Sequence, residues 1–215
     1  FRLGLEPGIQ KKQQSGHDFV FSVARHPDIG YVFSGYTVGS NLVLSDGRVI
    51  ATRGNRNHHG KNNASKGDVF NYKMDGLLFA LDDRGRLVES FGDHGVVFYG
   101  GTRQEKIYDV HVQPDGRILT AGRTASYDLD IKRPPREWGQ FDAAVFRFTP
   151  EGRLDPSFGE KGVVVMATNG DDQALRLTSD ADSHVRVLLH SDSHHYPFTT
   201  PTRPSRYRDG FLLGL

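Results

Sequence analysis

Residues 142–165, DAAVFRFTPEGRLDPSFGEKGVVV, decide the fold because this stretch recurs along the chain. A close copy spans residues 75–98, DGLLFALDDRGRLVESFGDHGVVF, and a third copy begins at Asp209 with DGFLLGL. The aspartates that open the three copies are spaced by 67 residues. A period of this length indicates an array of supersecondary units, each of which buries its apolar face against its neighbours.

Each complete copy reads as a strand, a long turn closed by Ser-Phe-Gly, and the start of another strand. The shared glycines, such as Gly85 and Gly152, permit turn conformations. We expect the shared Phe91 and Phe158 to fill the gap between neighbouring units. The recurrence therefore indicates a role in stability, and function is expected where the units differ.

Short runs that alternate apolar and polar residues predict strands between these copies. Asp46-Gly47 and Asp115-Gly116 each separate two such runs, and Asp-Gly supplies the positive φ of a tight hairpin turn. The third unit has residues 180–183, DADS, at this place, which predicts a longer turn. No segment keeps a helical period. We predict an all-β fold of four-stranded antiparallel units.

The units form one continuous domain in this interpretation. Degenerate N-terminal strands at 1–30 are expected to pack on a neighbouring unit, and the units that follow are expected at 31–83, 84–149 and 150–215. The strands expected in the first of these units are 31–37, 41–47, 48–54 and 75–81. The run 95–101 is expected to open the second unit.

Four antiparallel strands repeated at such a period are the plan of a β-propeller blade. Residues 112–122, VQPDGRILTAG, and 152–159, GRLDPSFG, resemble the bacterial delta-60 repeat, a propeller-type repeat. The resemblance covers residues 31–215 and implies a β-propeller-like array of about three blades. It implies no particular activity, because the family shares none. Since propellers have about four to eight blades, we expect another protein chain or further copies of this chain to complete the ring.

Composition excludes several classes of function. The net charge of +1 argues against nucleic acid as a partner, and apolar runs such as 77–81 are too short to span a bilayer. Cysteine is absent, so the chain has no disulfide, thiolate metal site or thiol nucleophile. Together with the resemblance, this absence favours an extracytoplasmic location, periplasmic or secreted.

Binding residues are expected in the three long connections that precede the aspartates, at 54–74, 124–141 and 191–208. These connections join the same two strands of each unit, so they should emerge on one face of the array. They are rich in the aromatic, histidine and arginine side chains that anchor interfaces. The candidate residues of this binding face are His58, His59, Tyr127, Arg133, Arg136, Trp138, His194, His195, Tyr196 and Arg206. The alternative is that the connections are solvated insertions.

The sequence contains no recognisable catalytic motif: no G-x-S-x-G elbow, P-loop, H-E-x-x-H or dinucleotide fingerprint. No cofactor is expected, and no metal, because adjacent histidines rarely both point toward one ion. The pairs Asp128/Asp130 and Asp180/Asp182 lack the glycine and distal glutamate of a calcium loop, so we interpret them as turn formers. His111 is interpreted as a structural histidine.

Two functions follow from these observations. The first is a non-catalytic β-propeller binding or scaffold module that docks a protein or ligand through the long connections, within a larger assembly. The alternative is part of a propeller-type enzyme, of hydrolase, lyase or quinoprotein style, with its active site in the central channel. Converging His, Asp or Arg side chains at the channel mouth would favour the enzyme.

Overall fold

The computed structural model describes residues 18–38, 42–43, 49–50, 74–100, 104–125, 141–167, 171–191 and 209–214. These residues form strands, turns and bends, and no helix occurs among them. The strands build three antiparallel sheets, which we call sheets I, II and III, and one separate hairpin. The all-β prediction is thus confirmed for the part of the chain that the structure describes.

The three sheets share one plan: within each sheet, strands that are consecutive in sequence order pair as antiparallel neighbours. Sheet I contains β1 (Asp18–His26), β2 (Gly30–Val38), β5 (Met74–Leu81) and β6 (Val96–Tyr99). Sheet II contains β7 (Glu105–Val112), β8 (Ile118–Thr124), β9 (Asp142–Phe148) and β10 (Val163–Met166). Sheet III contains β11 (Asp172–Ser179), β12 (Val185–Ser191) and β13 (Asp209–Gly214). The separate hairpin pairs β3 (Leu42–Val43) with β4 (Val49–Ile50).

The 67-residue spacing of the aspartates is the spacing of equivalent strands. Asp75, Asp142 and Asp209 lie at the start of the third strand of their sheets. Each aligns in register with a hydroxyl-bearing residue near or at the end of the second strand, namely Thr37, Thr124 or Ser191. The sequence repeat is therefore a repeat of whole sheets.

The structure groups some strands differently from the sequence interpretation. The run 95–101, expected to open the second unit, contains β6, which pairs with β5 and completes sheet I. The expected strands 41–47 and 48–54 correspond to β3 and β4, which form a sheet of their own. The β1–β2 hairpin takes their place in sheet I, so the expected boundary at residue 30 falls within this hairpin.

The β1–β2 hairpin is a further copy of the repeat, but it is hard to recognise in the sequence because its turn glycine is displaced by one residue. Residues 26–37, HPDIGYVFSGYT, align with residues 113–124, QPDGRILTAGRT, which form the turn before β8 and β8 itself. In the first segment the turn glycine, Gly30, stands one place later than Gly116, and both have positive φ, 108° and 82°. The Asp-Gly signal of a hairpin is consequently missing from the first copy.

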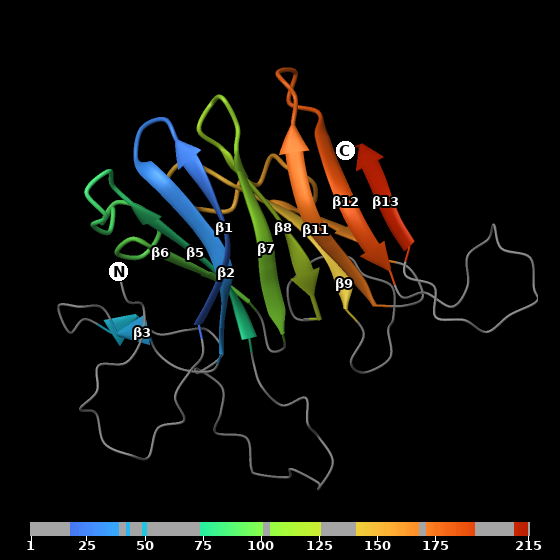
Figure 1. Ribbon diagram of the computed structural model, residues 1–215, viewed down its shortest axis with the longest axis horizontal. Helices are drawn as coiled ribbons and strands as arrows, with labels where there is room; N and C mark the ends of the chain where they lie inside the picture. Colours follow the sequence, from blue (N-terminus) through green and yellow to red (C-terminus); the bar gives the residue numbers. More distant parts are fainter. Residues whose placement is uncertain are drawn as a thin grey trace, which may run out of the picture.

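Sheet II lies between sheets I and III (Figure 1). In β9, Ala144 and Phe146 join the apolar cluster shared with sheet I, whereas Ala143 and Val145 join the cluster shared with sheet III. Because both faces of this sheet are buried, β9 is apolar over most of its length instead of alternating with polar residues.

The Ser-Phe-Gly turns fill the spaces between sheets, as the sequence predicts. Phe91 is buried in the cluster between sheets I and II, and Phe158 packs against the cluster between sheets II and III. The turns also touch one another, since the backbone N–H of Gly92 donates a hydrogen bond to the carbonyl of Glu151 at 2.8 Å.

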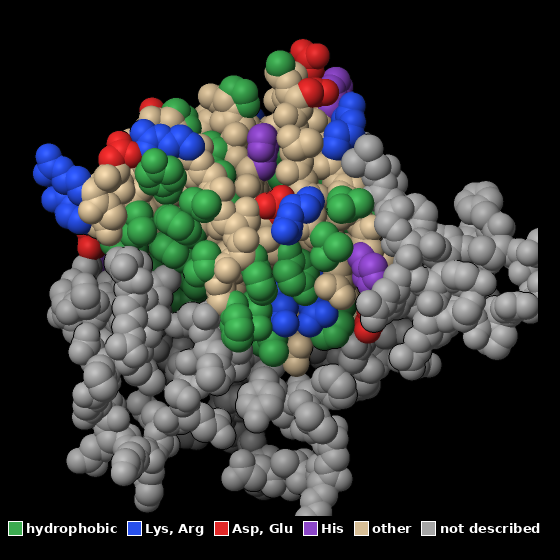
Figure 2. All heavy atoms as spheres, viewed as in Figure 1, with side chains coloured by type: hydrophobic (Ala, Val, Ile, Leu, Met, Phe, Trp, Pro, Cys, Tyr) green, Lys and Arg blue, Asp and Glu red, His purple; other side chains and the backbone are tan. Residues whose placement is uncertain are grey.

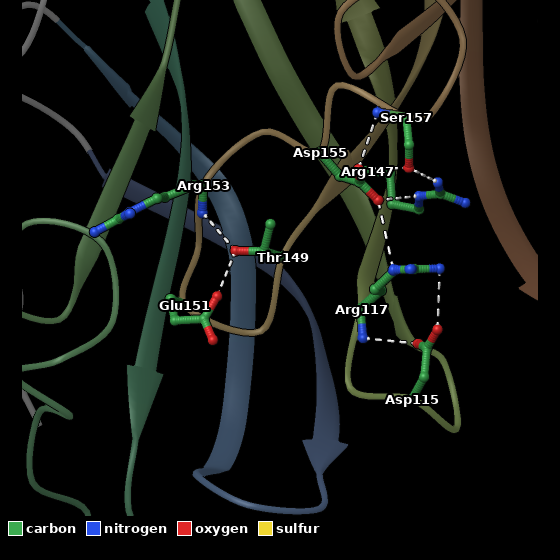
Figure 3. A network of polar contacts seen from close by, with 8 residues as sticks. All are labelled: Asp115, Arg117, Arg147, Thr149, Glu151, Arg153, Asp155 and Ser157. Carbon is green, nitrogen blue, oxygen red and sulfur yellow. Dashed lines mark hydrogen bonds and ion pairs between the residues drawn. The ribbon is translucent and has the colours of Figure 1, made fainter.

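A polar network fixes the second of these turns to sheet II (Figure 3). Arg147 of β9 donates from Nε to Oδ2 of Asp155 at 2.8 Å, and the Ser157 hydroxyl donates to Oδ1 at 2.6 Å. Arg117, beside the β7–β8 turn, places its Nε 3.5 Å from the same Oδ2. Burial alone would raise the pKa of Asp155, but the hydrogen bonds from Ser157 and the Arg147 charge outweigh it and lower the pKa. Asp155 is therefore a structural carboxylate.

Candidate ligand-binding end

All ten binding residues proposed from the sequence lie outside the described residues. They are His58, His59, Tyr127, Arg133, Arg136, Trp138, His194, His195, Tyr196 and Arg206. The structure does describe the strands that the long connections join. β2, β8 and β12 run toward the same end of the molecule, where β5, β9 and β13 begin (Figure 1). We call this the loop end, and the opposite end, which carries the β7–β8 and β11–β12 turns, the turn end.

Six described side chains gather at the loop end, close to the first strands of sheets I and II. They form the rim cluster, which consists of Phe21, Tyr36, Lys106, Tyr108, Arg123 and Phe141. In Figure 2, basic side chains lie among apolar ones on the lower part of the described surface.

The aromatic half of the rim cluster joins sheets I and II. Phe21 of β1 has its ring centroid 5.6 Å from that of Tyr36 and 5.5 Å from that of Tyr108 in the neighbouring sheet. Phe19 also stacks on Tyr36, with ring centroids 4.7 Å apart and 17° between the ring planes. Phe21 remains 44% exposed, so it presents a flat apolar surface to solvent.

The cationic half consists of Lys106 and Arg123, which lie directly opposite each other on β7 and β8. The Lys106 Nζ is 4.2 Å from the Tyr36 ring centroid, and the Arg123 guanidinium carbon is 3.7 Å from that of Phe141. Cations over aromatic faces at these distances are attracted by the ring quadrupole. The rings therefore offset part of the cost of holding two like charges together.

The electrostatics of this pair are unfavourable. Burial, and secondarily the Arg123 charge, lowers the pKa of Lys106 to about 8. Burial also lowers the pKa of Arg123, although Tyr108 and Asp171 act in the opposite direction. Neither cation forms an ion pair with any described residue, and the buried Nε of Arg123 has no hydrogen-bond partner among them. Asp171 instead accepts the backbone N–H of Phe141 at 3.0 Å.

A β-bulge at the same place in each sheet aims two of these rings. The extra residue is Phe21 in β1, Tyr108 in β7 and Leu175 in β11, as the register shifts show. Bulges are enriched near functional sites because they redirect a side chain without breaking the sheet. Here they bring Phe21 and Tyr108, from neighbouring sheets, into contact.

His111 has the structural role expected from the sequence. Its Nε2 is 2.9 Å from the Ser179 hydroxyl across sheets II and III, and burial lowers its pKa. A serine–histidine pair needs a carboxylate to orient the imidazole for nucleophilic catalysis. The nearby Asp109 is engaged with Ser22 and the backbone of Leu177 instead. Among the described residues, the pair therefore lacks the arrangement of a catalytic triad.

In the turn at residues 180–184, Asp180 acts as a turn former, as the sequence predicts. The Asp180 Oδ1 accepts the backbone N–H groups of Asp182 at 3.1 Å and His184 at 2.9 Å, and these bonds lower its pKa. These three side chains could together approach a metal ion, but all are exposed and the aspartate already shapes the turn. The other pair, Asp128 and Asp130, lies outside the described residues.

Sequence reasoning missed the rim cluster because a lysine and an arginine on short strands resemble ordinary solvent-facing positions. A signal was nevertheless present in the sequence. The Asp115-Gly116 turn fixes the register of the hairpin, and this register makes Lys106 and Arg123 cross-strand partners. Two like charges opposite each other are unusual in a sheet.

No family model matches this chain, and no curated protein matches it. The fold and the site together define an all-β protein of repeated antiparallel sheets with a cationic and aromatic cluster at one end. Within the described residues, no helix has the length and apolar character needed to cross a membrane.

Proposed function

We propose that the chain is a non-catalytic binding and scaffold module of the β-propeller kind, in which sheets I, II and III are successive blades of a larger assembly. The packing of the first strands supports this arrangement. β7 contacts β1, β2 and β5 of sheet I, and β11 contacts β7, β8 and β9 of sheet II. The same relation of one sheet to the next is repeated, as it is between propeller blades.

The observation that carries the proposal is an apolar surface of sheet I that is exposed over β1 and β2. In the first two strands of sheets I and II, residues 87 apart occupy equivalent positions, as the two bulges do. In sheet II, the residues that face sheet I are buried, with exposures of 0% for Ile107, 5% for Val110 and 0% for Ile118. Their equivalents in sheet I are exposed, at 48% for Val20, 52% for Val23 and 40% for Tyr31. Phe79 of β5 and Val96 of β6 continue this face of sheet I but are buried. We therefore propose the exposed β1–β2 part of the face as the docking surface.

The occupant we propose is sheet III of a second copy of this chain. The face of β12 turned away from sheet II carries Leu188, which is 42% exposed. Two copies that dock sheet I on sheet III in both directions give a closed ring with two-fold symmetry. Such a ring contains about six sheets, within the range of known propellers. The loop end would then be one face of this ring, and the connections that begin there would form its binding surface.

Sedimentation of the full-length chain tests the assembly. We expect a species of twice the 24.0 kDa chain mass. Val23→Glu should yield the single-chain mass, because it places a charge in the docking face. Arg84→Glu, a charge change in an exposed turn, is the matched control and should leave the dimer intact. A wild-type chain that stays monomeric, or a Val23→Glu variant that still dimerises, overturns the proposed assembly.

A further inference from the structure

The three sheets carry different side-chain pairs at one equivalent position of the loop end. In each sheet, the second residue of the first strand is paired in register with a residue near the end of the second strand. The pairs are Phe19 with Tyr36, Lys106 with Arg123, and Gln173 with His190. Positions that repeat in all sheets build the core, so a position that differs in each is free to serve recognition.

The cation pair of sheet II is costly without a ligand. Like charges directly opposite on neighbouring strands destabilise a sheet. The buried Nε of Arg123 donates no hydrogen bond to any residue that the structure describes, and such buried unsatisfied groups call for an explanation. A bound oxyanion would supply the missing negative charge, since arginine and lysine hydrogen-bond strongly to carboxylates and phosphates.

The neighbouring rings supply a second feature. Phe21 and Tyr108 are bulge residues held 5.5 Å apart, and Phe21 is partly exposed. Tyr36 links them to the cations, because it contacts Phe21 on one side and carries Lys106 over its face. An aromatic surface beside a positive charge is suited to a flat ligand that bears an anionic group.

We propose that the rim cluster binds a ligand that carries an oxyanion on a flat ring, with Lys106 and Arg123 binding the oxyanion and Phe21 and Tyr108 contacting the ring. This deepens the proposed function and rests on its assignment of the loop end as the binding surface. The oxyanion is a carboxylate or a phosphate, and the two are distinguished by the probes below.

The test is isothermal titration calorimetry of the full-length chain with phenyl phosphate, benzoate, inorganic phosphate and benzyl alcohol. We expect phenyl phosphate or benzoate to bind at least about tenfold more tightly than inorganic phosphate and benzyl alcohol, since only the first two combine ring and charge. The tighter of the two aryl anions identifies the oxyanion. If neither phenyl phosphate nor benzoate binds more tightly than inorganic phosphate, the role of the rings is overturned. No detectable binding of either aryl anion overturns the site.

Variants assign the binding to these residues. Arg123→Gln and Lys106→Met should each weaken binding of the aryl anion by about tenfold or more. Phe21→Ala should weaken the aryl anion and leave inorganic phosphate unchanged. Arg117→Gln, at the turn end, is the matched control and should bind as the wild type does. Unchanged binding by both cation variants, with circular dichroism showing intact sheets, overturns the proposal.

The outcomes of the two proposals can be separated. Val23→Glu removes the docking face of sheet I but not the rim cluster, so it should abolish dimerisation and keep anion binding. Arg123→Gln should weaken anion binding and leave dimerisation intact. Loss of both properties in either variant would show that the two sites are not independent, and would contradict the placement of the anion within a single chain.

Discussion

Ser22 of sheet I donates a hydrogen bond from its hydroxyl to Oδ1 of Asp109 in sheet II, across 2.7 Å. The other oxygen of this carboxylate accepts the backbone N–H of Leu177 in sheet III at 3.0 Å. One buried side chain therefore connects the first strands of all three sheets.

Replacement of Asp109 by alanine should destabilise the protein by roughly 3 kcal/mol, because it removes two charge-assisted hydrogen bonds and leaves a buried N–H unpaired. Ser22→Ala removes only one of these bonds and should cost roughly 1–2 kcal/mol. Urea unfolding measures both values. Equal losses in the two variants would mean that the bond to Leu177 contributes nothing.

Gly85 and Gly152 offer a matched pair, since they occupy the same place in successive copies of the repeat. Both have positive φ, 75° and 81°, so alanine should cost about 1 kcal/mol at either position. A methyl group at Gly85 meets nothing within 4 Å, whereas at Gly152 it would lie 3.0 Å from a ring carbon of Phe91 and 2.8 Å from Val97. Gly152→Ala should therefore lose roughly 1–3 kcal/mol more than Gly85→Ala in the same unfolding assay. Similar losses would argue against close packing of this turn on Phe91.

Asp155 should make stability depend on acid pH. Its pKa lies below the usual 3.8 in the folded chain, so it contributes stability above that pH and loses the contribution as the pH falls through its lowered pKa. Asp155→Asn should thus be less stable than the wild type near neutral pH, by about 1–2 kcal/mol. The two proteins should converge below pH 3.8, as measured by thermal unfolding over a pH series. A difference that persists unchanged in acid would exclude the carboxylate charge as its cause.

Lys106 should act in the alkaline range. Its pKa is about 8 in the folded chain, compared with the usual 10.5. Below pH 8 the buried ammonium group therefore destabilises the folded state, and this destabilisation is lost as the pH rises from 8 to 10.5. The groups that face it are Arg123, whose charge lowers its pKa further, and the ring of Tyr36. Between these pH values the wild type should gain stability relative to Lys106→Met. Parallel stability curves for the two proteins would contradict the burial of this ammonium group.

The sequence was sufficient to predict the repeat and its chemistry of burial. The 67-residue spacing marks the third strand of each sheet, and Phe91 and Phe158 lie between sheets, because apolar contacts between units have to recur when the units do. The β7–β8 hairpin at Asp115-Gly116 was also predictable, because its turn requires a positive φ that glycine supplies.

The first sheet was harder to predict because two segments compete for the same pattern. Residues 41–54 carry the Asp-Gly signal of the repeat, yet β3 and β4 form a separate hairpin. The segment that pairs with β5 lacks that signal, since Gly30 stands one place later. Strand pairing across the long connection between β2 and β5 depends on tertiary packing, which local turn chemistry does not determine. The rim cluster escaped prediction for a related reason, because it forms only when β1, β2, β7 and β8 are side by side.

The first strands have a consequence for how this protein can change over evolutionary time. On both sides of the bulge they keep apolar side chains at equivalent positions, which are Val20, Ile107 and Ala174 before it and Val23, Val110 and Leu177 beyond it. Phe19, Lys106 and Gln173, by contrast, share one equivalent position but no chemical character. Substitutions at this position can therefore accumulate without disturbing the apolar ones. A chain built this way can acquire new binding preferences, one sheet at a time, on an unaltered framework.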